Sequence, residues 1–274
     1  MISTITRKPA VAGRFYPGDA SSLRSTIEGF LGSSGVVAAP SGVRCVLVPH
    51  AGYVYSALTA AHAYVRVRGK RVDRVILLGC SHRYSFDGMS APLADAFATP
   101  LGSLRVDRDF IRELPRGKED FPGEPHDAEH SLEVQLPFLQ VALGDVPIVP
   151  ILFGGPFTPW HDNFALHLAA SVEKDDLVVV STDLSHYLTE TEANALDKQS
   201  LDTLLTQDVA AVLSESAKMG CTFCGVTAVA TGMAYCEAVG ANVWTLLEYR
   251  TSAAASGDTG RVVGYAALSM EDGA

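Results

Sequence analysis

Four short apolar runs, each followed by small or polar residues, constrain the fold of this chain most strongly. They occupy residues 43–48, 72–78, 146–153 and 177–180 and are rich in Val, Ile and Leu. Continuous apolar runs of this length are typical of strands that are buried on both faces. Helical patterns alternate with the runs, and no Pro/Ser-rich linker divides the chain. The sequence therefore predicts a three-layer α/β sandwich formed by residues 1–274 as one domain.

The segments between these runs predict the rest of the architecture. Residues 7–17 contain two prolines and are expected to form an extended arm, and residues 84–104 are expected to form a flap of short strands and turns. Glu129 and His130 are assigned to the start of a helix, and His126 has no assigned role. The remaining predicted elements are helices near 20–32, 54–69, 107–114, 129–143, 160–172, 190–205, 209–218 and 221–237, and strands at 243–250 and 262–270.

Charge and composition limit the class of partner and the compartment. The formal net charge is -10, whereas nucleic acids and anionic membranes attract clustered Lys and Arg, so we expect neither as a partner. The first residues lack the apolar core of a signal peptide, and no apolar run has transmembrane length. We therefore expect a soluble cytoplasmic protein. The five cysteines are an odd and sparse set, which favours reduced thiols over disulfides.

Histidine or aspartate follows three of the apolar runs. His50 and His82 lie just beyond the first and second runs, and Asp183 and His186 follow the run that ends at residue 180. Ligand sites in open α/β sheets lie outside the carboxyl ends of the strands, so these side chains are expected to share one crevice. Imidazole is a common ligand of iron, zinc and copper, which favours a metal site. The alternative is that the histidines lie on the surface and that the aspartate accepts backbone amides in a turn.

Two further hypotheses concern proton transfer and thiol chemistry. The carboxylate of Asp183 could orient the imidazole of His186, which would make that histidine a general base. Cys224 belongs to a Cys221-x-x-Cys224 motif and could act as a nucleophile with His186 as its base, as in a thiol-dependent hydrolase. A structural four-cysteine zinc site would need a second such motif, which the sequence lacks. A serine nucleophile elbow is disfavoured because Arg83 stands where its second glycine belongs.

Six segments of the chain stand out together: PAVAGRFYP at 9–17, PHAGYVYS at 49–56, CSH at 80–82, EHSLEVQLPF at 129–138, STDLSHY at 181–187 and CG at 224–225. In this order they resemble the Memo family, whose bacterial members are called AmmeMemoRadiSam system protein B. The resemblance extends over essentially the whole chain. By that resemblance the fold is expected to have a mixed central sheet and to be similar to the class III extradiol dioxygenases of the LigB type.

The resemblance implies roles for individual residues. His50, His82 and Cys224 would be the metal ligands, and His186 would be the catalytic base with Asp183 beside it. The implied ion is Fe(II), with copper or zinc as alternatives because a thiolate is a softer ligand than a carboxylate. The implied function is oxidative chemistry on an unidentified small molecule. A non-catalytic peptide-binding protein is the alternative, and AMMECR-domain and radical SAM proteins are implied partners.

Overall fold

The predicted apolar runs form the centre of one large sheet. The computed structural model describes residues 4–38, 42–115, 123–220 and 222–273. Four parallel strands lie side by side in the order β2-β8-β3-β7, and nearly all of their residues are buried. They are β2 (Val43–Val48), β3 (Val75–Cys80), β7 (Ile148–Phe153) and β8 (Leu177–Ser181). Their buried faces explain why the sequence shows continuous apolar runs in place of an alternating pattern.

Antiparallel strands extend the sheet on both sides, so the sheet is mixed, as expected. β11 (Val262–Glu271) pairs with β2, and β10 (Val243–Thr251) pairs with β11 at one edge. β4 (Met89–Ser90) pairs with β7 at the other edge. β9 (His186–Leu188) is a short strand that pairs with β11. The last strand in chain order therefore lies inside the sheet, beside β2.

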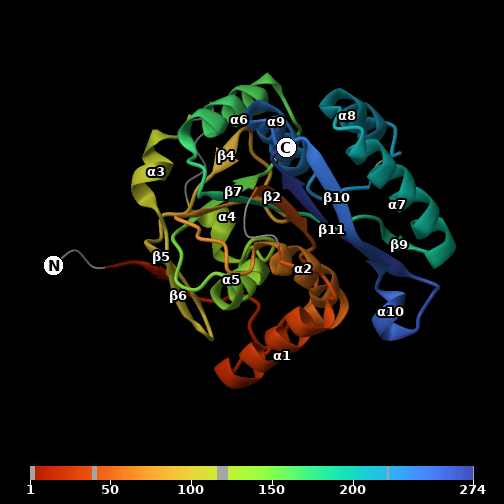
Figure 1. The fold of residues 1–274 in the computed structure, drawn as a ribbon, viewed down its shortest axis with the longest axis horizontal. Coiled ribbons are helices and arrows are strands. Elements are labelled where there is room, and N and C mark those ends of the chain that lie inside the picture. Colours follow the sequence, from red (N-terminus) through yellow and green to blue (C-terminus); the bar gives the residue numbers. More distant parts are fainter. Residues whose placement is uncertain (1–3, 39–41, 116–122, 221, 274) are drawn as a thin grey trace.

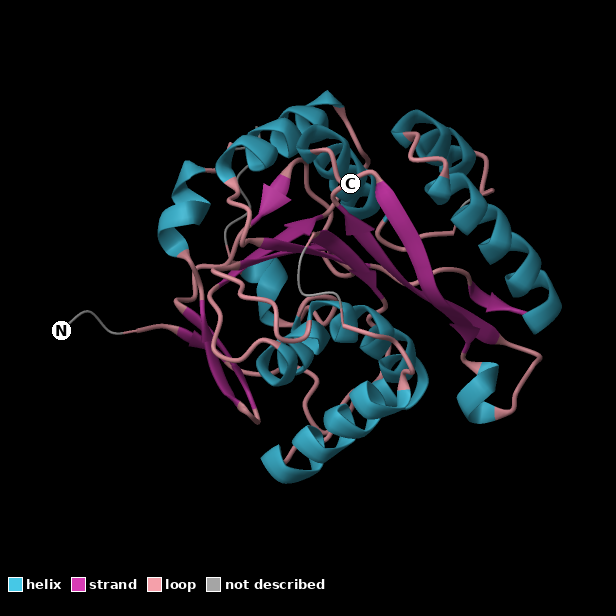
Figure 2. Ribbon diagram, in the orientation of Figure 1, coloured by secondary structure: helices cyan, strands magenta, loops and turns pink. Residues whose placement is uncertain are grey.

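Helices cover both faces of the sheet, which confirms the α/β sandwich (Figures 1 and 2). One layer contains α1 (Ala20–Ser33), α2 (Tyr53–Val67) and α5 (Leu136–Ala142), which pack on one another and, through α2, on β2 and β11. The other layer contains α6 (Pro159–Ser171), α9 (Val226–Val239), α8 (Val209–Ala217) and α7 (Glu190–Leu205). Within it, α9 packs on the four parallel strands and on α6.

The N-terminal arm and the predicted flap form a second, small sheet. It consists of β1 (Thr6–Arg7), β5 (Ala96–Thr99) and β6 (Gly102–Arg105). The buried carboxylate of Glu133 fixes the arm, because it accepts hydrogen bonds from the Arg7 guanidinium and the Tyr16 hydroxyl. The remaining short helices are α3 (Arg108–Glu113), α4 (Glu124–Asp127) and α10 (Ala253–Ser256).

The helix predicted from residue 129 begins later than expected. A 3-10 turn, η1 (Glu133–Gln135), precedes α5, and Glu129 and His130 lie before both. Pro137 is the physical reason, because proline fits the first turn of a helix and not its interior. Glu129 is thereby released from a helical role and accepts hydrogen bonds from its surroundings.

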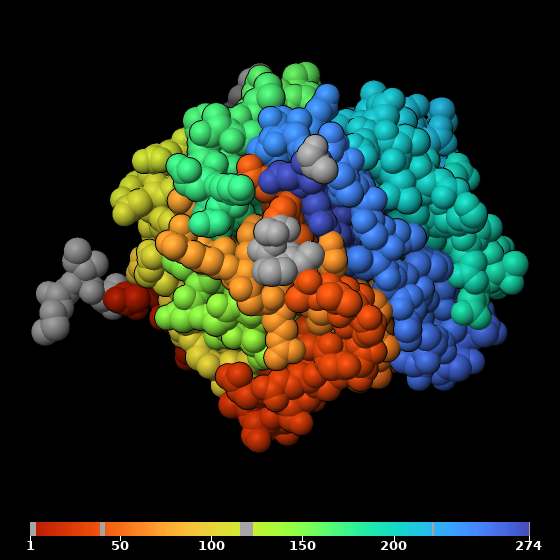
Figure 3. All heavy atoms as spheres, viewed as in Figure 1, coloured from red at the N-terminus to blue at the C-terminus, as the bar shows by residue number. Residues whose placement is uncertain are grey.

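The surface view in Figure 3 shows that distant parts of the sequence lie side by side. The C-terminal residues, in blue, adjoin the orange surface of α2, in agreement with the packing of α2 on β10 and β11. Within the described part of the chain, every helix is too short or too polar to span a bilayer.

Candidate metal centre

Three neighbouring strands place the predicted side chains together at their carboxyl ends, on one end of the sheet. β2 is followed by His50, β8 by Asp183 and β3 by His82, and these strands are adjacent and parallel. Cys224 comes from the loop that precedes α9. The predicted convergence at the carboxyl ends of the strands is therefore present in the structure.

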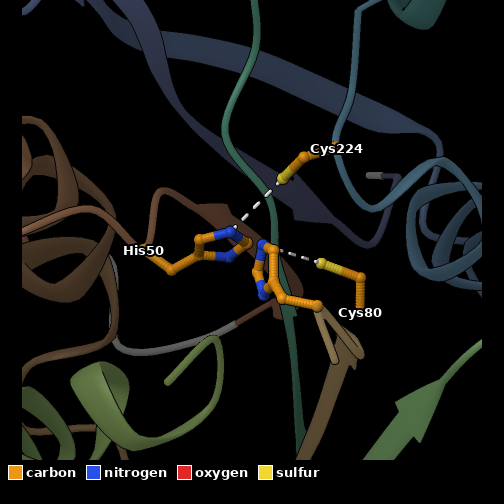
Figure 4. A group of neighbouring side chains, drawn as sticks. His50, Cys80 and Cys224 are labelled. Carbon is orange, nitrogen blue, oxygen red and sulfur yellow. Dashed lines mark hydrogen bonds between the residues drawn. The ribbon is translucent and has the colours of Figure 1, made fainter. Parts of the chain in front are cut away.

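Four potential ligand atoms lie close together at this edge (Figure 4). The Nε2 atom of His50 is 3.3 Å from Cys224 Sγ, and the Nε2 atom of His82 is 3.7 Å from Cys80 Sγ. The ligand atoms of these four residues all lie within 4.8 Å of one another. The structure thus brings together the three predicted ligands His50, His82 and Cys224, and it adds Cys80, which the sequence reasoning missed.

The tautomer of His50 follows from its hydrogen bonds. Its Nδ1 atom lies 3.0 Å from the Ser181 hydroxyl, which itself donates to the Ser131 carbonyl at 2.6 Å. The hydroxyl proton is therefore used, so Ser181 must accept from His50, and Nδ1 carries the ring proton. When the ring is neutral, this leaves Nε2 with a free lone pair on the side that faces Cys224, which is the state that a metal ligand needs.

Glu129 fixes His82 in the same tautomer. Its carboxylate accepts from His82 Nδ1 at 2.8 Å and from the His82 backbone N–H at 2.7 Å. It also accepts from the backbone N–H groups of His130 and Ser131. A carboxylate that holds the outer nitrogen of a histidine is a common arrangement around metal ions. Sequence reasoning placed Glu129 in a helix and so missed this contact.

His130 completes the wall of the site. Its ring stacks on that of His82 with centroids 4.5 Å apart, and Phe15 of the N-terminal arm contacts its edge. His82, Glu129 and His130 form a second group of potential ligands. The Glu129 carboxylate, however, is already occupied by the four donors named above, so this group is better suited to orient His82.

The two cysteines have opposite acidities. A hydrogen bond from the Cys80 thiol holds the pKa of Cys224 well below its usual range, and the nearby His50 acts in the same direction against the effect of burial. The same hydrogen bond raises the pKa of Cys80, and burial adds to the increase. The Asp183 backbone N–H also donates to Cys224 Sγ at 3.2 Å. Cys224 is therefore poised as a thiolate, the form in which cysteine ligates metals.

The acidity of the two histidines reflects this thiolate. Burial alone would lower the pKa of His50, but Cys224 and Asp183 outweigh it and raise the pKa to about 9. Burial alone would also lower the pKa of His82, but Cys224 and Glu129 outweigh it and raise this pKa to about 10. In the metal-free protein both rings therefore hold an extra proton at neutral pH. A metal ion must displace these protons to bind.

Among the described residues, the hydrogen bonds of Asp183 and His186 lead to different partners. The buried Asp183 carboxylate accepts from the His50 backbone N–H at 2.7 Å, and burial raises its pKa. His186 is exposed on β9, and its Nδ1 lies 2.8 Å from the Leu184 carbonyl. A carbonyl therefore orients the imidazole of His186, while Asp183 fixes the loop that carries His50. Cys221 lies outside the described residues.

A cavity of about 280 Å³ lies beside the cysteines. It is lined by Cys80, Cys224, Phe153, the glycines that follow β7 and the first residues of α9. A larger cavity, about 580 Å³, lies between the N-terminal arm and α4, and His126 lines it. None of the four potential ligands lines that larger cavity, whereas the smaller one borders Cys80 and Cys224.

Comparison with known proteins identifies the family. A profile of Memo-like proteins matches residues 7–269. This chain belongs to the Memo family. It is 37% identical to a MEMO1 family protein of Methanobrevibacter smithii over 95% of this chain and 98% of that protein. A MEMO1 family protein of Aquifex aeolicus is 32% identical over 94% and 97%, respectively. Among solved structures, an uncharacterized protein from Escherichia coli K12 covers 82% of this chain and 99% of its own, with 12% identity and a TM-score of 0.49.

Proposed function

We propose that this Memo-family protein binds one transition-metal ion through His50, His82 and Cys224 and uses it in oxidative chemistry on a small molecule. One observation carries the proposal. Both imidazoles have Nδ1 occupied, by Ser181 and by Glu129, and both direct Nε2 toward sulfur in a group of atoms that lie within 4.8 Å of one another. Histidines bound at one nitrogen and held at the other are typical of metal centres.

The donor set fits iron, copper and zinc. Imidazole suits all three ions, and a thiolate favours the softer ones. We propose Fe(II) as the ion for oxidative chemistry, with copper and zinc as the alternatives. When bound, a redox-active ion would pass electrons from the substrate to O₂, which is the oxidant.

The protein's own residues would position the substrate and move protons. The cavity of about 280 Å³ admits a small molecule next to Cys224. His186 donates from Nδ1 to Leu184, so its Nε2 is free to accept a proton from a bound molecule. Asp183 holds the backbone of His50 and so keeps the first ligand in place.

Anaerobic titration with Fe(II), Cu(I) and Zn(II) tests the metal site. We expect one equivalent to bind, and we expect His50→Ala, His82→Ala and Cys224→Ala each to abolish binding. His167→Ala is the matched control, because His167 is exposed on α6 and its ring bonds only to the Glu113 carbonyl among the described residues. Binding that survives all three substitutions would overturn the proposal.

Oxygen uptake tests the oxidative chemistry. The metal-loaded protein is screened with candidate phenols and other small reductants, and His186→Ala is tested beside it. We expect His186→Ala to keep its metal and to lose oxygen uptake. Equal uptake by His186→Ala and the unchanged protein would remove His186 from the mechanism.

A thiol-dependent hydrolase or transferase is the second candidate. It is favoured by the 3.3 Å approach of Cys224 Sγ to His50 Nε2, which makes a thiolate–imidazolium pair. The base in this alternative is therefore His50, and not His186 as the sequence suggested. Ester hydrolysis by the metal-free protein that is lost in Cys224→Ala would favour it over the metal site.

A further inference from the structure

Cys80 lies in the site although no role was assigned to it. It is the last residue of β3, and its register opposite Phe153 of β7 fixes its backbone. Its carbonyl accepts from the Ser131 hydroxyl at 2.8 Å, which anchors the strand end further. Its side chain lines the same cavity as Cys224. Figure 4 shows the Cys80 and Cys224 sulfur atoms directed toward the imidazole nitrogens.

The close packing around Cys80 also brings the Cys224 loop to β3. A Cβ atom added at Gly225 would lie 3.3 Å from the Ser181 carbonyl oxygen and 3.6 Å from the Cys80 Cβ atom. Gly225 is thus tightly packed against the end of β8 and lies at ordinary contact distance from the end of β3. Both sulfurs are held by backbone that is packed on the sheet.

The nitrogen–sulfur distances match those of a tetrahedral centre. With bond lengths of about 2.0–2.1 Å to nitrogen and about 2.3 Å to sulfur, two ligands of a tetrahedral zinc ion are about 3.6 Å apart. The His50–Cys224 and His82–Cys80 pairs are 3.3 Å and 3.7 Å apart. We propose that Cys80 is a fourth protein ligand, which makes this a His₂Cys₂ centre.

A fourth protein ligand changes which metal the site selects. Sites with three protein ligands keep a position for water or substrate, whereas four protein ligands close the coordination sphere. Two thiolates also favour thiophilic ions, so Cys80 shifts the preference from Fe(II) toward Zn(II) and Cu(I). This inference rests on the proposed metal site. With Cys80 as a ligand, Zn(II) and Cu(I), which the proposed function names as alternatives, take the place of Fe(II) as the ions that the site selects.

Anaerobic Co(II) titration followed by absorbance tests the role of Cys80. The unchanged protein, Cys80→Ser, Cys80→Ala and the neighbouring control Ser81→Ala are compared. We expect one equivalent of cobalt in each, with the thiolate-to-cobalt charge-transfer absorbance reduced by about half in both Cys80 variants because one of two Co–S bonds is lost. The affinity for Zn(II), measured by displacement of cobalt, is expected to fall by more than about tenfold in these variants.

The outcomes separate the two proposals. If the unchanged protein binds no cobalt, the proposed metal site itself is wrong. If it binds cobalt and the Cys80 variants give the same absorbance and zinc affinity, Cys80 is not a ligand, while the three-ligand site stands.

X-ray absorption of the zinc-loaded, unchanged protein gives a check that needs no variant. We expect two sulfur and two nitrogen neighbours around zinc. One sulfur with only lighter neighbours would overturn the role of Cys80 even if both variants failed to fold.

Discussion

Two pairs of cysteines lie in the same sandwich, in opposite surroundings. Cys45 in the middle of β2 and Cys236 near the end of α9 are fully buried, and burial raises the pKa of the Cys236 thiol. Cys80 and Cys224 lie at the edge of the sheet, and Cys224 is held as a thiolate. Strand β2 contains Cys45 and leads to His50, and helix α9 contains Cys236 and follows Cys224. The comparison teaches that position along an element decides whether a sulfur serves packing or chemistry.

Alkylation should show the largest difference between the pairs. In the metal-free protein at pH 7 we expect iodoacetamide to label Cys224 orders of magnitude faster than Cys45 or Cys236, because of these three cysteines Cys224 alone is partly exposed and has a lowered pKa. Mass spectrometry of timed samples measures the rates, and urea-unfolded protein is the control in which all sites label. Rapid labelling of Cys236 in the folded state would break the comparison.

The histidines show the same contrast, and pH should reveal it. Burial holds the pKa of His126 at about 4, below the ordinary 6.5, so the unfolded state binds more protons between these values. The contribution of His126 to the free energy of unfolding is therefore greatest above pH 6.5. It falls by on the order of 3 kcal/mol as the pH falls toward 4. Urea unfolding at several pH values measures it. We expect His126→Gln to show a flatter dependence than the unchanged protein, and an identical slope would refute this origin.

Glu129→Gln tests the carboxylate that orients His82 at the site. The change removes the negative charge that His82 Nδ1 faces at 2.8 Å, so we expect metal affinity to fall by about 10–100-fold. Competition with a chromophoric chelator measures the affinity. Glu28→Gln, on the exposed face of α1, is the matched control. Unchanged affinity in Glu129→Gln would mean that this carboxylate serves folding alone.

Serine substitutions should give the smallest effect, which is a change in stability. Here the buried cysteine should be more sensitive than the cysteine at the site. Cys236→Ser buries a hydroxyl in the apolar core, which we expect to lower the free energy of unfolding by about 1–3 kcal/mol. Cys80→Ser in metal-free protein should cost less than about 1 kcal/mol, because Cys80 is partly exposed. Urea unfolding measures both, and a larger cost at Cys80 would contradict the assignment of the two regions.

The sequence predicted the sheet and part of the site for a local reason. Buried strands produce continuous apolar runs, and the residues just after them must lie at one edge, which located His50 and His82. Cys80 follows the run at 72–78 and was missed because the ligand roles came from the resemblance, which assigns them to His50, His82 and Cys224 only. Glu129 was missed because its partner His82 is 47 positions away, and no local periodicity records such a pairing.

The place of β11 in the sheet has a consequence for the order of assembly. β11 covers the open edge of β2, so β2 lacks its neighbour on that side until residues 262–271 have left the ribosome. His50 follows β2 directly, and its loop is held by Asp183, whose neighbour Leu184 donates its backbone N–H to Gly264 at 2.9 Å. The nascent chain must therefore be synthesised through β11 before the site can close, and a chain cut after Gly260 would present the edge of β2 to other chains.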